Sequence, residues 1–256
     1  MPTILVNEHE IFYAARAIER QPRLLLIHGA GGSHLDWPPQ LRRFDPFGTC
    51  AIDLPGHGRS ALPACSSVQA YAEAVLALTD RLALRQIILV GHSMGGAIAL
   101  DIALRHKDHI VGLVLVATGA RLKVSQELIR LVEANHSAAV DYVAAAAWGT
   151  DASPELIHRA SQLMLSCEPS TMQMDFSACN DFDVMPELDD IAIPTLVLVG
   201  SEDRMTPPKF GRYLADHIPH AEFVSVAGAG HMLAMEQPDL VGDAIRDFIH
   251  RRLALS

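Results

Sequence analysis

A serine flanked by glycines is the residue of this sequence best placed to do chemistry. Ser93 lies in the pentapeptide Gly91-His92-Ser93-Met94-Gly95, after an apolar run at 87–90 and before a helix-forming stretch at 96–104. A serine at a sharp strand-to-helix turn, with glycine two positions away on either side, presents its hydroxyl as a nucleophile. Such a turn strains the backbone and leaves no room for neighbouring side chains. Taken alone, the pattern also fits a glycine-rich turn whose serine caps the helix.

A serine hydroxyl needs a base within hydrogen-bond reach, and two later loops offer the partners. His231 lies in the glycine-rich segment 227–231, directly after the last expected strand. Imidazole, with a pKa of about 6.5, can take a proton and return it. Asp203, after the preceding strand, would orient that imidazole and stabilise its charged form. Glu202 is the alternative carboxylate. The chain order Ser, Asp, His is that of one of the known triad arrangements.

The segment His28-Gly29-Ala30-Gly31 ends an earlier expected strand, and its glycines let its backbone approach a reaction centre closely. We expect the N–H groups of Ala30 and Met94 to form an oxyanion hole. The alternative is a degenerate phosphate loop. However, His34 stands where the third glycine of G-x-G-x-x-G would be, and no G-K-[ST] follows.

Strands that alternate with helices must bring these residues together. Apolar runs at 23–27, 49–54, 87–90, 110–116, 194–200 and 221–226 are separated by helical patterns at 67–82, 96–104, 208–217 and 236–252. This alternation predicts an α/β fold with a mostly parallel, doubly wound sheet. Two short strands at 3–6 and 11–17 are expected to form a hairpin at the sheet edge. The turns at 28–33, 91–95, 200–206 and 227–232 would then share the carboxyl edge of the sheet, where ligands bind.

The alternation stops between residues 119 and 190, where helical patterns at 128–132, 138–148 and 154–165 follow one another. We interpret this segment as a helical insertion between two strands of one sheet. The predicted organisation is a core of residues 1–118 and 191–256 with an inserted domain of residues 119–190.

Composition excludes several classes of protein. The chain has 256 residues, of which 50% are hydrophobic, and a formal net charge of −10. The charge argues against nucleic acid or an anionic membrane as a partner. The four cysteines show no C-x-x-C spacing, so neither a disulfide framework nor a zinc site is expected. Without a signal-peptide or membrane-span pattern, we expect a cytoplasmic protein that is a monomer or a homodimer.

These motifs together resemble the α/β-hydrolase superfamily over essentially the full chain. Gly91 to Gly96 is similar to its nucleophile elbow, 28–31 to its oxyanion motif, and 53–60 (DLPGHGRS) to its D-x-P-G-x-G-x-S turn. Gly200-Ser201-Glu202-Asp203 and Gly230-His231 occupy the places of its acid and histidine loops. The resemblance implies an α/β-hydrolase fold with a helical cap (lid) formed by the insertion. In this context Asp53 and His57 belong to a rigid turn rather than to a metal site.

The expected function is a serine carboxylesterase that needs no metal or organic cofactor. Ser93, His231 and Asp203 would be catalytic, Ala30 and Met94 would bind the oxyanion, and Gly29, Trp148 and Met232 would contact a small ester with an apolar acyl group. Together with Trp148 and Met232, five further residues are expected either to line an apolar pocket or to pack the insertion against the core. They are Leu122, Leu163, Met164, Met172 and Met174.

Other chemistries on the same fold stay open. Dehalogenases and epoxide hydrolases of this superfamily use an aspartate nucleophile. Because this chain has Ser93 at that position, both activities are disfavoured. A carbon–carbon bond hydrolase is the strongest alternative, although such relatives usually carry Asn where His92 stands. A lactonase, a thioesterase and a perhydrolase also fit. An aminopeptidase would need carboxylates in the insertion to hold the free amine of its substrate. The acidic residues available there are expected to be solvated; they are Glu133, Asp175, Asp181 and Asp183. In a different class, the chain would be a non-catalytic small-molecule receptor.

Overall fold

The computed structural model describes residues 2–6, 9–106 and 108–253. Its centre is an eight-stranded sheet in the order β1-β2-β4-β3-β5-β6-β7-β8. The strands β3 to β8 are parallel, whereas β2 pairs antiparallel with both β1 and β4. The predicted α/β class, the parallel sheet and the edge hairpin are therefore confirmed. The strands are β1 (Thr3–Val6), β2 (His9–Arg16), β3 (Arg23–Ile27), β4 (Gly48–Ile52), β5 (Ile87–His92), β6 (Ile110–Val116), β7 (Thr195–Gly200) and β8 (Glu222–Val226).

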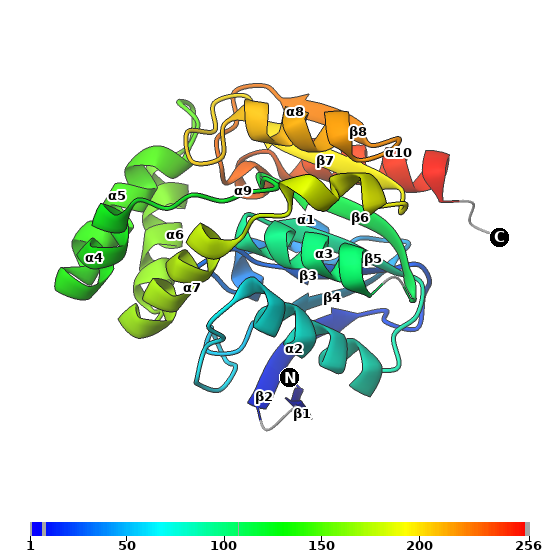
Figure 1. Cartoon of the computed structure of the whole chain (residues 1–256), viewed down its shortest axis with the longest axis horizontal. Helices are drawn as coiled ribbons and strands as arrows, with labels where there is room; N and C mark the ends of the chain where they lie inside the picture. The colour runs from blue at the N-terminus through cyan, green and yellow to red at the C-terminus, as the bar shows by residue number, and fades with distance from the viewer. Residues whose placement is uncertain (1, 7–8, 107, 254–256) are drawn as a thin grey trace.

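Helices cover both faces of this sheet (Figure 1). One apolar core joins the sheet to helices α2 (Val68–Arg81), α3 (Met94–Arg105) and α8 (Pro208–His217). A second core on the opposite face joins it to α1 (Pro39–Arg42), α9 (Leu233–Glu236) and α10 (Pro238–Arg252). Strands β4, β5 and β7 are buried at every position, as expected for strands covered on both faces.

Four helices lie between β6 and β7 and gather beyond one end of the sheet in Figure 1. They are α4 (Gln126–Ala134), α5 (His136–Ala147), α6 (Pro154–Leu165) and α7 (Pro169–Asp181), called the inserted helices below. Side-chain oxygens of Ser125, Asn135 and Ser153 cap the first three. These caps accept otherwise unpartnered N–H groups and so fix where each helix begins. The inserted helices share a third apolar core of their own.

Several helices differ from the sequence-based expectation. The single helix expected at 236–252 is interrupted at Gln237, between α9 and α10. Pro238 is the reason, because proline has no N–H to donate and is suited to the first turn of a helix. Helix α7 was not predicted at all. Short 3-10 helices, η1 (His34–Asp36) and η2 (Met185–Asp190), complete the chain.

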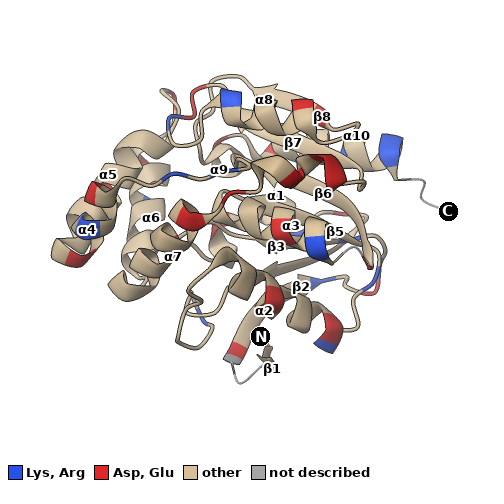
Figure 2. Cartoon of the chain, viewed as in Figure 1, with Lys and Arg blue, Asp and Glu red and all other residues tan. Residues whose placement is uncertain are grey.

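Charged residues of both signs are spread along the chain. In the view of Figure 2, Lys and Arg are scattered among Asp and Glu rather than gathered in one patch. Within the described part of the chain, none of the helices has the length and apolar character required to cross a membrane.

Candidate active site

Ser93 occupies the turn between β5 and α3 with a strained backbone. Its φ is +52° and its ψ is −116°, a conformation that a residue with a side chain rarely adopts. A Cβ on Gly91 would collide with the carbonyl of Gly95, and one on Gly95 would collide with the carbonyl of Ile27. Both glycines are therefore required for the helix to pack this closely against the strands. The turn places Ser93 on the wall of a cavity.

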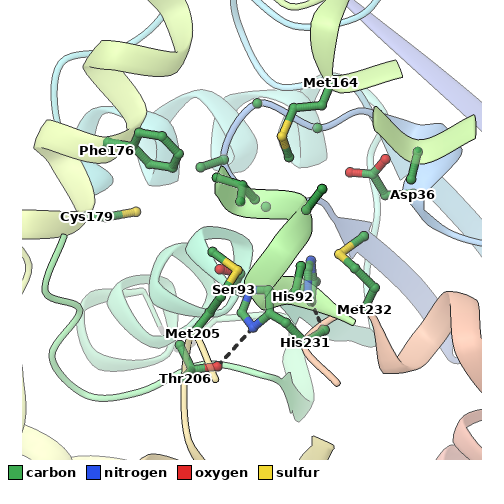
Figure 3. A pocket seen from close by; sticks show the side chains of 18 of the residues that line it. Asp36, His92, Ser93, Met164, Phe176, Cys179, Met205, Thr206, His231 and Met232 are labelled. Carbon is green, nitrogen blue, oxygen red and sulfur yellow. Dashed lines mark hydrogen bonds between the residues drawn. The ribbon is translucent and has the colours of Figure 1, made fainter. Parts of the chain in front are cut away.

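His231 reaches the same cavity from the loop after β8 and is paired with Asp203 from the loop after β7. Its Nδ1 lies 2.9 Å from Asp203 Oδ2. The hydroxyl of Thr206 donates to the same carboxylate oxygen at 2.7 Å and lies 3.1 Å from Nδ1 (Figure 3). Since the carboxylate can only accept, Nδ1 carries the proton and Nε2 has the lone pair. Among the described residues, Nε2 has no hydrogen-bond partner.

Asp203 is held as an anion by several donors. Its Oδ1 accepts the N–H groups of Met205 and Thr206, each at 2.8 Å. Burial alone would raise the pKa of this carboxyl, but His231 and the hydrogen bonds from Thr206 outweigh burial and lower the pKa. Glu202, the alternative acid, is fully exposed and bonds Thr150 on the surface instead. The structure thus brings Asp203, and not Glu202, to His231.

His92 is a second imidazole at this site, and its contacts were not foreseen. Its ring lies 4.8 Å from the ring of His231, and its Nε2 lies 3.0 Å from the backbone oxygen of His231. Because a carbonyl only accepts, Nε2 must donate. Burial, followed by the charge of His231, lowers the pKa of His92 to about 3, so this ring is neutral. His92 therefore holds the backbone of His231 without competing as a cation.

The glycine-rich loop after β3 approaches Ser93 closely. A Cβ on Gly29 would lie 3.2 Å from Ser93 Cβ and 3.1 Å from His92 Nδ1. Ala30 lines the cavity beside it. Among the described residues, the N–H groups of Ala30 and Met94 have no hydrogen-bond partner. Met94 is the first residue of α3, where helices leave their N–H groups unused. Both expected oxyanion donors are thus available.

Two carboxylates that sequence reasoning did not single out complete the surroundings. Glu236 accepts the N–H groups of Gly230 at 3.0 Å and Gly149 at 2.9 Å, which ties the His231 loop to the segment after α5. Asp36 lines the cavity (Figure 3), and burial raises its pKa to about 6 against the opposing hydrogen bond from Ser33. The sequence signal for Asp36 was its place three residues after Ser33, which forms a capping box.

The cavity between the sheet edge and the inserted helices contains about 1020 Å³ of unfilled space, its mouth included. Gly29, Trp148 and Met232 line it as expected, and so do two further expected residues, Leu122 and Met164. Leu163, Met172 and Met174 do not belong to its wall. Met172 belongs to α7 and is buried with its Cε against Gly31, whereas Met174 of the same helix packs toward the main core.

The polar side chains of the turn after β4 bind other buried groups of the protein and do not face the cavity. Asp53 Oδ1 accepts from the backbone N–H of His34 and lies 2.8 Å from His34 Nδ1, and its Oδ2 accepts from Arg59 N–H. His57 pairs with Asp175 of α7 at 2.7 Å rather than with Asp53. Asp175 was expected to be solvated, and that expectation is wrong: its side chain is completely buried. The reason is that α7 packs this face against the core.

Comparisons with known proteins agree with this arrangement. The sequence model of the alpha/beta hydrolase family matches residues 24–244. A pimeloyl-[acyl-carrier protein] methyl ester esterase of Neisseria meningitidis is 30% identical over 89% of this chain and 93% of its own length. The 3-oxoadipate enol-lactonase 2 of Acinetobacter baylyi is 26% identical over 97% of this chain and 96% of its own.

A solved structure extends the likeness to three dimensions. A thermophilic esterase from Thermogutta terrifontis superposes with a TM-score of 0.88 at 28% identity, covering 98% of both chains. Because the family model matches residues 24–244, most of the sequence, the chain belongs to the alpha/beta hydrolase family.

Proposed function

We propose that this protein hydrolyses carboxylic esters of small molecules through an acyl-enzyme on Ser93. The observation that carries the proposal is the shared cavity wall of Ser93 and His231, with His231 held through Nδ1 by buried Asp203. This arrangement leaves Nε2 as the base for a serine hydroxyl. The esterases and the enol-lactonase among the relatives support ester bonds as the class of substrate.

In the first half-reaction, Ser93 Oγ attacks the ester carbonyl carbon while His231 Nε2 takes the hydroxyl proton. Negative charge develops on the carbonyl oxygen, where the N–H groups of Ala30 and Met94 would stabilise it. Losing one such donor costs about 3 kcal/mol of transition-state stabilisation. Collapse of this intermediate breaks the bond to the alkoxy oxygen. The alcohol leaves with the proton from His231, and the acyl group stays on Ser93.

In the second half-reaction, His231 takes a proton from water, whose oxygen attacks the acyl carbon. The second tetrahedral intermediate collapses, Ser93 regains its proton from His231, and the carboxylic acid is released. Asp203 keeps the imidazole oriented and compensates its positive charge in both halves. No step draws on a metal or an organic cofactor.

We propose that residues 119–190 act as a cap that shapes the acyl pocket. Val140, Val143, Ala147 and Phe176 contribute apolar side chains to the cavity from α5 and α7. Apolar walls of this kind favour an uncharged acyl group over a carboxylate. Gly29, Trp148 and Met232 would contact the substrate around Ser93.

A lactonase is the second candidate, because one relative is an enol-lactonase and a lactone is an internal ester. The two activities share every catalytic step and differ only in whether the alcohol stays attached to the acid. A carbon–carbon bond hydrolase has less support, since hydrolases of that kind in this superfamily usually carry Asn at the position of His92.

Turnover of p-nitrophenyl esters of graded acyl length, run beside a lactone, an acyl thioester and a ring-cleavage dienone, tests the proposal. We expect the esters or the lactone to be preferred, with Ser93→Ala lowering kcat at least 10³-fold. Preference for the dienone would assign carbon–carbon bond cleavage instead. Ester turnover that survives Ser93→Ala would contradict the proposed role of Ser93. Complete absence of turnover in the wild type would contradict the enzyme proposed here and favour a receptor.

A further inference from the structure

Asp175 is a buried carboxylate outside the triad, and it joins the inserted helices to the loop expected to form the oxyanion hole. Its Oδ2 accepts from the Gly31 N–H at 2.8 Å and lies 2.7 Å from His57 Nε2. Its Oδ1 accepts from the Tyr71 hydroxyl at 2.6 Å. These partners come from the loop after β3, the turn after β4, and α2. One side chain of α7 therefore contacts three separate parts of the core.

An imidazolium at His57, paired with an ionised Asp175, satisfies both polar contacts of the ring, and these contacts raise the pKa of His57 against its burial. Its Nδ1 lies 3.0 Å from the carbonyl oxygen of Pro55, and its Nε2 faces Asp175. A carbonyl and an ionised carboxylate only accept, so both ring nitrogens of this imidazolium donate. The neighbouring His28 is neutral, since its Nε2 accepts from Leu54 N–H while its Nδ1 faces a carbonyl. One buried cation thus compensates one buried anion, which is the condition under which such charges are tolerated.

The Gly31 amide is the contact that concerns catalysis. Gly31 follows Ala30 directly and has a φ of +65°, and the loop 29–32 has only the Ala30 methyl as a side chain. Such a loop has little of its own to hold it in one conformation. The bond to Asp175 fixes the peptide plane between Ala30 and Gly31. Met172, one turn earlier on α7, packs its Cε against the same glycine.

We infer that Asp175 is a positioning residue: it holds the 29–32 loop in the conformation that presents the Ala30 N–H to the oxyanion. The oxyanion site is then complete only when α7 is docked on the core. This inference rests on the proposed function, because it gives the inserted helices a role in the chemical step beyond lining the pocket. Asp175 acts through Ala30 and does not touch the substrate.

Three variants separate positioning from general stabilisation. Asp175→Ala removes the acceptor for Gly31. Asp175→Asn keeps a carbonyl that can accept the same N–H. Tyr71→Phe is the matched control, since it removes an equally buried bond to Asp175 but from Oδ1, away from Gly31. For each variant, two properties are measured. They are kcat and KM for p-nitrophenyl butyrate, and the rate of backbone hydrogen–deuterium exchange in the 28–33 segment.

For Asp175→Ala we expect kcat to fall about 30-fold, part of the 10²–10³ that loss of a whole oxyanion donor costs. KM should change less than about threefold, because the ester ground state makes little use of this donor. Asp175→Asn should recover at least about a third of kcat. Tyr71→Phe should stay within about twofold of the wild type. Exchange in the 28–33 segment should accelerate about tenfold in Asp175→Ala alone.

Equal losses of kcat in Asp175→Ala and Tyr71→Phe, or unchanged kcat and exchange in Asp175→Ala, would overturn the inference. If the alanine variant fails to fold, Asp175→Ser is measured in its place with the same expected results. If wild-type turnover does not depend on Ser93, the proposed function fails. The exchange measurement then still decides whether Asp175 anchors the loop.

Discussion

Two of the buried histidine–carboxylate pairs, His231–Asp203 and His57–Asp175, differ in what the second ring nitrogen of the histidine does. Asp203 contacts His231 at 2.9 Å, and Asp175 contacts His57 at 2.7 Å. The Nδ1 of His57 also donates to the carbonyl of Pro55, and the ring is buried against α7. His231 keeps Nε2 without a partner among the described residues and lines the cavity beside Ser93. A buried imidazole is thus a potential base only where one nitrogen is left to accept a proton.

The two carboxylates also act at different places. Asp203 comes from a loop at the carboxyl edge of the sheet, where neighbouring backbone N–H groups fix it. Asp175 comes from an inserted helix and fixes other elements in turn. In the proposed mechanism the first pair serves the chemistry directly, whereas we infer that the second holds the parts that surround it.

Exchanging each histidine for glutamine is the strongest way to break this comparison. His231→Gln should lower kcat for an ester about 10⁴-fold, because no base remains for Ser93. His57→Gln should keep kcat within about tenfold while lowering the free energy of unfolding by about 3 kcal/mol, since it leaves a buried carboxylate uncompensated. Steady-state kinetics and urea unfolding of both variants provide the measurement. Similar kinetic losses in the two variants would show that the pairs do not differ in role.

Replacing the carboxylate that pairs with His231 should have the next largest effect on kcat. Asp203→Asn should lower kcat at least about 100-fold, because the amide can no longer hold the tautomer of His231 or compensate its charge. Glu202→Gln, one residue away and on the surface, should stay within about twofold. Initial rates across pH 6–9 compare the two. Full activity in Asp203→Asn together with loss in Glu202→Gln would reassign the acid.

A smaller effect is expected in the pH dependence of stability. Burial disfavours the imidazolium of His57, but Asp175 outweighs burial and raises its pKa above the unfolded value of about 6.5. The folded state then binds more protons than the unfolded state above that pH. The contribution is complete below about pH 6.5 and is lost as pH rises through the folded pKa.

The stability difference between the wild type and His57→Gln should therefore shrink between pH 6 and pH 9, as His57 loses its proton in the folded protein. Urea unfolding at several pH values measures it. A difference that grows with pH would mean that His57 is neutral in the folded protein. Asp203 would act in the opposite direction at acid pH, because its pKa is lowered and its contribution is lost as pH falls.

The sheet and the triad loops could be predicted because their signals are local. Continuous apolar runs mark strands buried on both faces, and the glycines around Ser93 mark a turn that tolerates nothing larger. The residues that follow parallel strands must share one edge. Placing Ser93, Asp203 and His231 together therefore required no knowledge of tertiary contacts.

The inserted helices were less predictable because their signals depend on packing. The buried face of α7 includes Thr171 and Asp175, so the apolar periodicity that marks a helix is interrupted. From the sequence alone, Asp175 is expected to be a solvated carboxylate, because its partners His57 and Tyr71 lie more than 100 residues away along the chain. The roles of Glu236 and His92 depend in the same way on backbone groups that only the fold brings near.

Trapping the acyl-enzyme tests the central claim most directly. The wild type is mixed with excess p-nitrophenyl ester, quenched in acid within milliseconds, and analysed by intact-mass and peptide mass spectrometry. We predict a covalent adduct of one acyl group on the peptide that contains Ser93, formed with a burst of p-nitrophenol and absent in Ser93→Ala. Steady turnover with no adduct on Ser93, or an adduct on another residue, would contradict the account.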